Sequence, residues 1–112
     1  MRMWNVPPAV LCQKHLLGEH VEMHMFVGSI NKGKSIAGFL ADCLVDTRLI
    51  KQRHSELRVE MLARGMNHQS PLPEYEPTPV PGHVDVEANL VELARRCPAC
   101  AELQRRYYAR AA

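Results

Sequence analysis

The chain has 112 residues, which is enough for one domain, and 46% of them are hydrophobic and 23% charged, as in an ordinary globular protein. Aromatic residues make up only 5%, so we expect a mainly aliphatic core. No uncharged run approaches the roughly 20 apolar residues of a membrane span, and no secretory signal is recognisable. We therefore expect a cytoplasmic protein whose four cysteines are reduced thiols or metal ligands, with no disulfide framework.

The net charge of +2 is distributed unevenly along the chain. Residues 1–67 sum to +3, residues 68–94 to −5 and residues 95–112 to +4. A basic body and a basic tail thus flank an acidic stretch. This arrangement permits a phosphate-facing surface, although a mixed solvated surface explains it equally well.

The first half of the chain has helical periodicity. Pro7 and Pro8 favour a helix start, and residues 9 to about 30 place apolar side chains on one stripe. A lysine-bearing turn at residues 31–34 precedes a short apolar helix over residues 36–44, for which Ser35 is a candidate cap.

Asp46 can cap the next helix, over residues 47–64, and Gly65 is placed to end it. Five prolines in residues 66–82 predict an extended connector with no central strand. Asp85 can cap a helix over residues 86–96, and a last short helix is expected over residues 99–109. No repeat and no strand periodicity is visible, so the prediction is a compact all-α domain of about four to five helices spanning residues 1–112.

Four motifs have both a chemical and a plain structural interpretation. Residues 28–35 fit the phosphate-loop pattern G-x-x-x-x-G-K-[ST], but a chain this short without other strands cannot build the sheet that such a loop requires. His20 and His24 have metal-ligand spacing, but Val21 stands where a metallohydrolase helix carries glutamate. The favoured interpretation is that both histidines are solvated or lie at the edge of the core. Glu19 and Glu22 are close to Gly18 in sequence, and because glycine has no side chain, a ligand could approach the helix closely there.

The third motif is Cys97-Pro98-Ala99-Cys100, half of a zinc site. It would need two further ligands, for which Cys12, His68 and His83 are candidates. Two buried thiols are the favoured interpretation. In the tail, Arg105, Arg106, Tyr107 and Tyr108 combine cations with aromatic rings, which suits phosphate contact and base stacking or, equally, the frayed end of an amphipathic helix.

Taken together, these segments resemble the pyrimidine-dimer DNA glycosylase family of the phage endonuclease V type, small all-α enzymes that excise a base and then cleave the abasic strand. About half of the chain takes part in the resemblance. The matching residues are Arg2 at the start, His15, Leu16, Glu19 and Glu22 in the first helix, Arg53, Glu56, Leu57, Glu60, Leu62, Arg64, Gly65 and Asn67 in the helix after residue 46, and the Tyr107-Tyr108 tail.

The resemblance implies that the α-amine of Met1 is the nucleophile, that Glu22 moves protons, and that Arg2 contacts phosphate or the pocket. A free α-amine has a pKa of about 7.7–8.0, so part of it is neutral at cellular pH. The resemblance further implies a monomer in the bacterial or phage-infected host cytosol that binds damaged or modified double-stranded DNA without cofactor or metal. Its expected DNA contacts are Arg2, His15, Glu19, His20, His24, Arg48, Lys51, Arg105, Arg106, Tyr107 and Tyr108.

The chain departs from the family at two positions on the first helix. Where the family has arginines flanking its glutamate, this chain has Val21 and Met25. His20 and His24 are nearby but weaker replacements, so dimer specificity is the least secure part of the resemblance, and DNA binding should be less salt-sensitive. The alternatives are a DNA-binding module without catalysis and a zinc-stabilised helical interaction protein.

Overall fold

The computed structural model describes residues 1–67 and 70–111. No strand occurs in this part of the chain, where Asp46 and Gly82 form an isolated β-bridge. The all-helical prediction is therefore confirmed. The α-helices are α1 (Gln13–Asn31), α2 (Ala37–Ala41), α3 (Ile50–Ala63), α4 (Val86–Arg96) and α5 (Pro98–Ala111), with 3-10 turns η1 (Pro8–Val10) and η2 (Thr47–Leu49).

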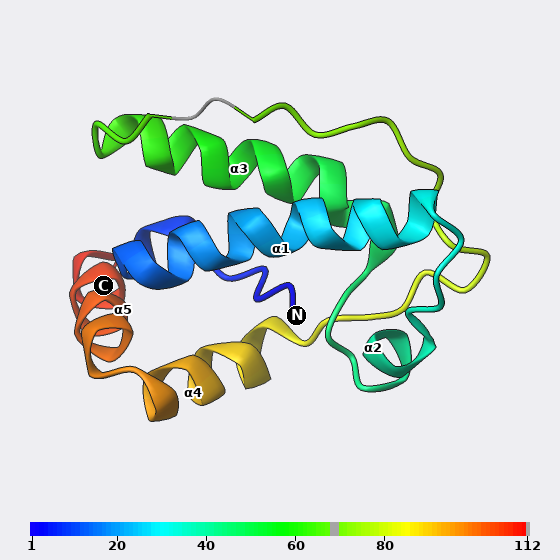
Figure 1. Cartoon of the computed structure of the whole chain (residues 1–112). Helices are drawn as coiled ribbons and strands as arrows, with labels where there is room; N and C mark the ends of the chain where they lie inside the picture. Colours follow the sequence, from blue (N-terminus) through cyan, green and yellow to red (C-terminus); the bar gives the residue numbers. More distant parts are fainter. Residues whose placement is uncertain (68–69, 112) are drawn as a thin grey trace.

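Helix α1 crosses the middle of the molecule, with α3 along one side of it and α4 along the other (Figure 1). Helix α5 lies beside the start of α1, and α2 lies toward its opposite end. The N-terminal segment enters the core: Met3, Val6 and Val10 are completely buried. Because this segment passes through the interior, neighbouring elements fix the place where the chain begins.

Several helix boundaries differ from those predicted. The first helix begins at Gln13 because Cys12 has an extended backbone, and residues before it form η1. The short apolar helix covers only residues 37–41. Cys43 takes a positive φ of 58°, which ends the helix, and the Leu44 carbonyl accepts a hydrogen bond from Met3 N–H at 2.6 Å.

The predicted caps are confirmed where Asp46 accepts from Arg48 N–H and Asp85 accepts from Ala88 N–H, both at 3.0 Å. Each bond satisfies an N–H group that the first turn of a helix leaves without a carbonyl. Gly65 follows α3 with a φ of +77°, as a helix-ending glycine should. The bounds of α4 are those predicted, and Pro98 is the first residue of α5, where its missing N–H costs nothing.

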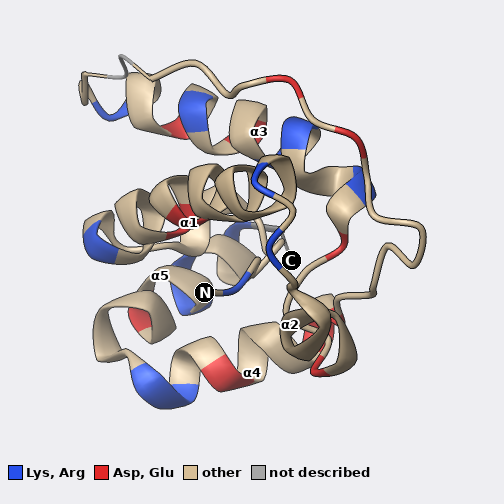
Figure 2. Cartoon of the chain, turned by 45° about the vertical axis from the view of Figure 1, so that its right-hand side comes forward, with Lys and Arg blue, Asp and Glu red and all other residues tan. Residues whose placement is uncertain are grey.

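The proline-rich connector runs along η2. Thr47 N–H donates to the Pro81 carbonyl at 2.8 Å, and the Tyr75 hydroxyl donates to the Thr47 carbonyl at 2.6 Å. Acidic positions follow the connector along one edge, away from the N-terminus (Figure 2). No helix in the described ranges has the length and apolar character needed to cross a membrane.

Candidate active site

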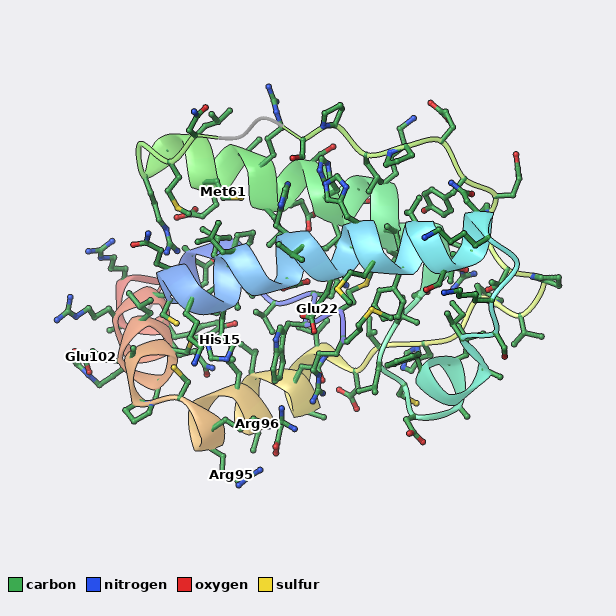
Figure 3. The ribbon with its side chains drawn as sticks, viewed as in Figure 1. His15, Glu22, Met61, Arg95, Arg96 and Glu102 are labelled. Atoms are coloured by element: carbon green, nitrogen blue, oxygen red, sulfur yellow. The ribbon has the colours of Figure 1, made fainter. Side chains whose placement is uncertain are left out.

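The α-amine of Met1 lies 3.7 Å from Glu22 Oε1. The Met1 side chain is 15% exposed and the Glu22 side chain 30%, so the pair is partly shielded yet reachable from solvent. Figure 3 shows Glu22 projecting from α1 toward the side on which α4 lies. The structure therefore brings together a primary amine and a carboxylate, the two groups that the sequence-based mechanism needs.

A buried carboxylate on the same helix holds the segment that carries this amine. Glu19 Oε2 accepts hydrogen bonds from the backbone N–H groups of Trp4 and Asn5 at 3.1 and 3.4 Å. Arg53, from α3, donates to the two oxygens of Glu19 at 2.6 and 2.9 Å and to the Val6 carbonyl at 2.7 Å. Residues 4–6 are thus hydrogen-bonded to side chains of both α1 and α3.

This arrangement changes the interpretation of Glu19, which we expected among the DNA contacts. Its residue exposure is 1%, and that of Arg53 is also 1%. A buried carboxylate paired with a buried guanidinium stabilises the fold only when both are fully hydrogen-bonded, as they are here. Glu19 therefore has a place in the fold, and we leave it out of the proposed DNA surface.

Arg2, the residue after Met1, contacts both Asn89 and Trp4. Its guanidinium donates to Asn89 Oδ1 at 2.8 Å and lies 4.0 Å from the centre of the Trp4 ring. Asn89 in turn donates to the Trp4 carbonyl at 2.8 Å. Arg2 Nε is buried without a hydrogen-bond partner, and burial, helped by Arg96, lowers the pKa of the Arg2 guanidinium.

Burial raises the pKa of Glu22 above its ordinary value, and the nearby Glu19 adds to this. The α-amine and the Arg2 backbone N–H oppose the shift without cancelling it. A carboxylate whose pKa moves toward neutrality can both accept and return a proton, as a general acid–base group must.

Each member of the amine–carboxylate pair lines a different groove, and Val21 lines both grooves. One groove, of about 420 Å³, is lined by Met1 and by His24, Lys32 and Lys34. The other, of about 480 Å³, is lined by Glu22 together with Trp4 and Gly18. A Cβ added at Gly18 would meet nothing within 4 Å, so the second groove is open at that position.

Lys32 and Lys34 were missed as functional candidates by the sequence analysis. They belong to the phosphate-loop pattern, which the structure shows to be the end of α1 and a turn with Gly33 at a φ of +69°. Their ammonium groups border the Met1 groove, where they could contact phosphate. The two-lysine turn was the available signal, but only the fold shows which groove it borders.

The histidines of α1 lie in different surroundings. His20 and His24 form a group with His54 of α3, with ring centres 4.8 to 5.0 Å apart. His20 is 6% exposed, whereas His24 is partly exposed and faces the Met1 groove. His15 instead lies among three cysteines, while also bordering the Glu22 groove.

The remaining predicted DNA contacts lie in two separate places. Arg48 and Lys51 are exposed at η2 and the start of α3, near one end of the molecule, while α5 lies at the other end (Figure 1). On α5, Arg105 and Arg106 both pair with Glu102 at the surface. The side chains of Tyr107 and Tyr108 are exposed, and their ring centres are 5.0 Å apart. The two cationic sets thus lie toward opposite ends of the molecule (Figure 1).

Fold and site together define a small all-helical protein with a chain-terminal amine facing a glutamate between two grooves. A family model described as pyrimidine dimer DNA glycosylase matches residues 1–74, and no curated protein and no solved structure matches the chain. The chain belongs to the pyrimidine dimer DNA glycosylase family. Membership implies, at the level of the family, a DNA glycosylase with DNA as its substrate.

Proposed function

We propose that the protein is a DNA glycosylase with abasic-site lyase activity, in which the α-amine of Met1 is the nucleophile and Glu22 the general acid–base group. The observation that carries this proposal is the 3.7 Å approach of the amine to a carboxylate whose pKa is raised, with each of the two residues lining a groove. The proposal takes Met1 as the first residue of the mature chain.

In the proposed reaction the neutral amine attacks C1′ of the deoxyribose, and the base leaves with the electrons of the glycosidic bond and a proton. The lone pair of the attached nitrogen then breaks the C1′–O4′ bond, so that the sugar ring opens to a protonated imine and O4′ takes up a proton relayed by Glu22. The protonated imine acidifies the C2′ proton. Loss of that proton expels the 3′ phosphate by β-elimination, which cleaves the strand. Glu22 is placed to stabilise the iminium charge and to relay these protons.

The target nucleotide has to leave the base stack to reach the amine, at a cost of a few kcal/mol that is smallest for a damaged site. The two grooves have volumes suited to small-molecule-sized groups, so each can take a sugar or a base. Lys32 and Lys34 line the Met1 groove and supply positive charge for the flanking phosphates, and the positive charge of Arg2 acts on Glu22. We further propose a monomer that acts in the cytoplasm on damaged or modified double-stranded DNA.

Reductive trapping tests this proposal. The full chain, with its first residue verified by mass spectrometry, is incubated with borohydride and duplexes that carry an abasic site, a pyrimidine dimer or no lesion. We expect a covalent protein–DNA adduct on the abasic duplex. A second adduct, on the dimer duplex, would assign dimer specificity despite Val21 and Met25.

Three variants sharpen the test. Acetylation of the terminus should abolish the adduct, Glu22→Gln should reduce it strongly, and Glu76→Gln, at an exposed connector position, should leave it unchanged. An adduct that survives acetylation would disprove the role of the Met1 amine. Salt-dependent DNA binding with no adduct on any duplex would instead identify a non-catalytic DNA-binding module.

A further inference from the structure

Four side chains far apart in sequence meet beside the start of α1. The ligand atoms of Cys12, His15, Cys97 and Cys100 all lie within 4.8 Å of one another. Cys12 precedes α1 and His15 is in its first turn, while Cys97 precedes α5 and Cys100 is in its first turn. At each of the two helix starts, the residue before the helix and the third helical residue thus contribute a side chain to the cluster, with two residues between them.

Three of the six distances between these atoms are close to those of a tetrahedral metal site. Zn–S bonds of about 2.3 Å at tetrahedral angles separate two sulfur ligands by about 3.8 Å, and a sulfur from an imidazole nitrogen by about 3.6 Å. In the structure the Sγ atoms of Cys12 and Cys97 are 3.9 Å apart. His15 Nδ1 lies 3.2 Å from Cys12 Sγ and 3.5 Å from Cys100 Sγ.

Backbone N–H groups around the cluster point at its sulfur atoms. Cys12 N–H donates to Cys100 Sγ at 3.2 Å, and Cys100 N–H donates to Cys97 Sγ at 3.4 Å. Hydrogen bonds of this kind, together with the positive ends of two helices, would stabilise sulfur ligands once a bound metal ion has displaced their protons. Lys14 and Arg96 add positive charge beside His15.

We propose that Cys12, His15, Cys97 and Cys100 bind one Zn²⁺ ion in a closed, structural Cys3His site. Four protein ligands fill a tetrahedral shell and leave no position for water or substrate, which marks a structural site and not a catalytic one. Soft thiolate ligands with one imidazole select zinc over the hard cations. This proposal replaces the sequence-based expectation of no metal, and it stands independently of the lyase mechanism.

The ion would add a further link between parts of the chain that are already joined by Asn89, which bonds to Arg2 and to the Trp4 carbonyl. Cys12 and Cys97 are 85 residues apart, and both Cys97 and Cys100 lie beyond the residues that match the family model. Zinc would therefore fasten the α4–α5 hairpin to the start of α1. His15 also packs edge-on against Trp4, with ring centres 6.2 Å apart, and Arg2 stacks on the same Trp4 ring. A metal ion that fixes His15 would therefore also support Trp4 and the N-terminal segment.

The sequence analysis named Cys12 as a possible partner of the Cys97–Cys100 pair but not His15. Its other candidates do not join the cluster: His83 is exposed and outside it, and His68 lies outside the described residues. The missed signal was the spacing Cys12-x-x-His15, which repeats the spacing of Cys97-x-x-Cys100. The group of His20, His24 and His54 also offers three ligand atoms, but it contains no thiolate, so spectroscopy separates the two sites.

Metal analysis and cobalt substitution test the proposal on the full chain. Protein purified without chelator should contain about one equivalent of zinc. After removal of zinc, Co²⁺ should produce a thiolate-to-cobalt charge-transfer band and the intense visible bands of a tetrahedral site, and added Zn²⁺ should bleach both. Cys100→Ser should weaken cobalt affinity by more than about a hundredfold, because even outer-shell partners change metal affinity by about 10–100-fold.

Matched variants keep the outcome decisive even if Cys100→Ser unfolds. His15→Cys should retain one equivalent of metal with a stronger charge-transfer band, since it converts the site to four thiolates. Cys43→Ser, at an exposed cysteine outside the cluster, and His24→Gln should both leave the spectrum unchanged. Folded wild-type chain that shows no charge-transfer band with Co²⁺ would overturn the proposal. A Cys12–Cys97 disulfide in freshly isolated protein, or a cobalt spectrum unaffected by Cys100→Ser, would overturn it as well.

Discussion

Replacing Glu19 by glutamine is expected to lower the free energy of unfolding by about 3–5 kcal/mol, the typical effect of removing one partner from a buried ion pair. The carboxylate accepts two hydrogen bonds from Arg53 and one each from the N–H groups of Trp4 and Asn5. Glutamine has nearly the same shape, but its side-chain nitrogen is a donor and would face other donors. The guanidinium of Arg53, only 1% exposed, would then be buried without its counter-charge.

The individual contacts support this magnitude. The amide oxygen of the introduced glutamine can keep the bonds that one carboxylate oxygen accepts, whereas the donors facing the other oxygen lose their acceptor. Each buried donor left without a partner costs about 1–3 kcal/mol, and more when it is charged. Domains of this size have unfolding free energies of about 5–15 kcal/mol, so the variant should fold but with a much smaller margin.

Urea unfolding followed by far-ultraviolet circular dichroism measures the effect. Glu60→Gln is the matched control, because Glu60 pairs with Arg64 at 2.8 Å while both side chains are 25% exposed; it should cost less than about 1 kcal/mol. Combining Glu19→Gln with Arg53→Met removes the stranded charge and should restore part of the loss. A loss below about 1 kcal/mol for Glu19→Gln alone would refute the account of Glu19 as the anchor of the N-terminal segment.

Two further predictions concern Glu22 and the glycines. Because burial raises the pKa of Glu22, its ionised form is the less stable one in the folded chain, and the stability present at low pH is lost as pH rises through that pKa. Glu22→Gln mimics the protonated form and should therefore unfold at a higher urea concentration than wild type at pH ~7. The difference should vanish below the ordinary glutamate pKa of 4.5. Equal urea midpoints for the two proteins at pH ~7 would contradict this. Gly65→Ala should lower the free energy of unfolding by about 1–2 kcal/mol, because alanine has to adopt a left-handed backbone there, although its Cβ meets open space. Gly82→Ala should lower it further, because at a φ of +84° the added Cβ would also collide with the Val45 carbonyl oxygen. Equal thermal unfolding temperatures for the two variants would show that this contact relaxes.

The elements that the sequence predicted well are those defined by local rules. Helix α4 matches its predicted bounds because Asp85 caps its first turn and its apolar residues recur at helical spacing. The prolines of the connector exclude helix and central strand wherever they fall. The largest boundary errors occurred at the start of α1 and in α2. Cys12 N–H donates to the distant Cys100 Sγ, and Cys43, next to the Leu44 carbonyl that accepts from Met3 N–H, takes a positive φ. The helix expected over residues 47–64 also begins with the 3-10 turn η2.

The functional site was predictable only through the family resemblance. That resemblance paired Met1 with Glu22, and the structure places the two groups 3.7 Å apart. It also placed Glu19 on the DNA, whereas the structure buries Glu19 against Arg53. Two glutamates one helical turn apart have the same local sequence character, and only packing against α3 separates the buried Glu19 from the partly exposed Glu22.

The residue pattern alone determined an all-helical chain, its caps, its extended connector and the uneven distribution of its charge, since each depends on neighbours a few positions away. The tertiary structure decided which side chains share a site: Glu19 with Arg53, the Met1 amine with Glu22, and Cys12 and His15 with Cys97 and Cys100. Periodicity specifies which face of a helix is apolar, but not which distant helix that face packs against. The meeting of groups up to 88 residues apart depends on how whole helices pack, and that packing is settled only when the core closes.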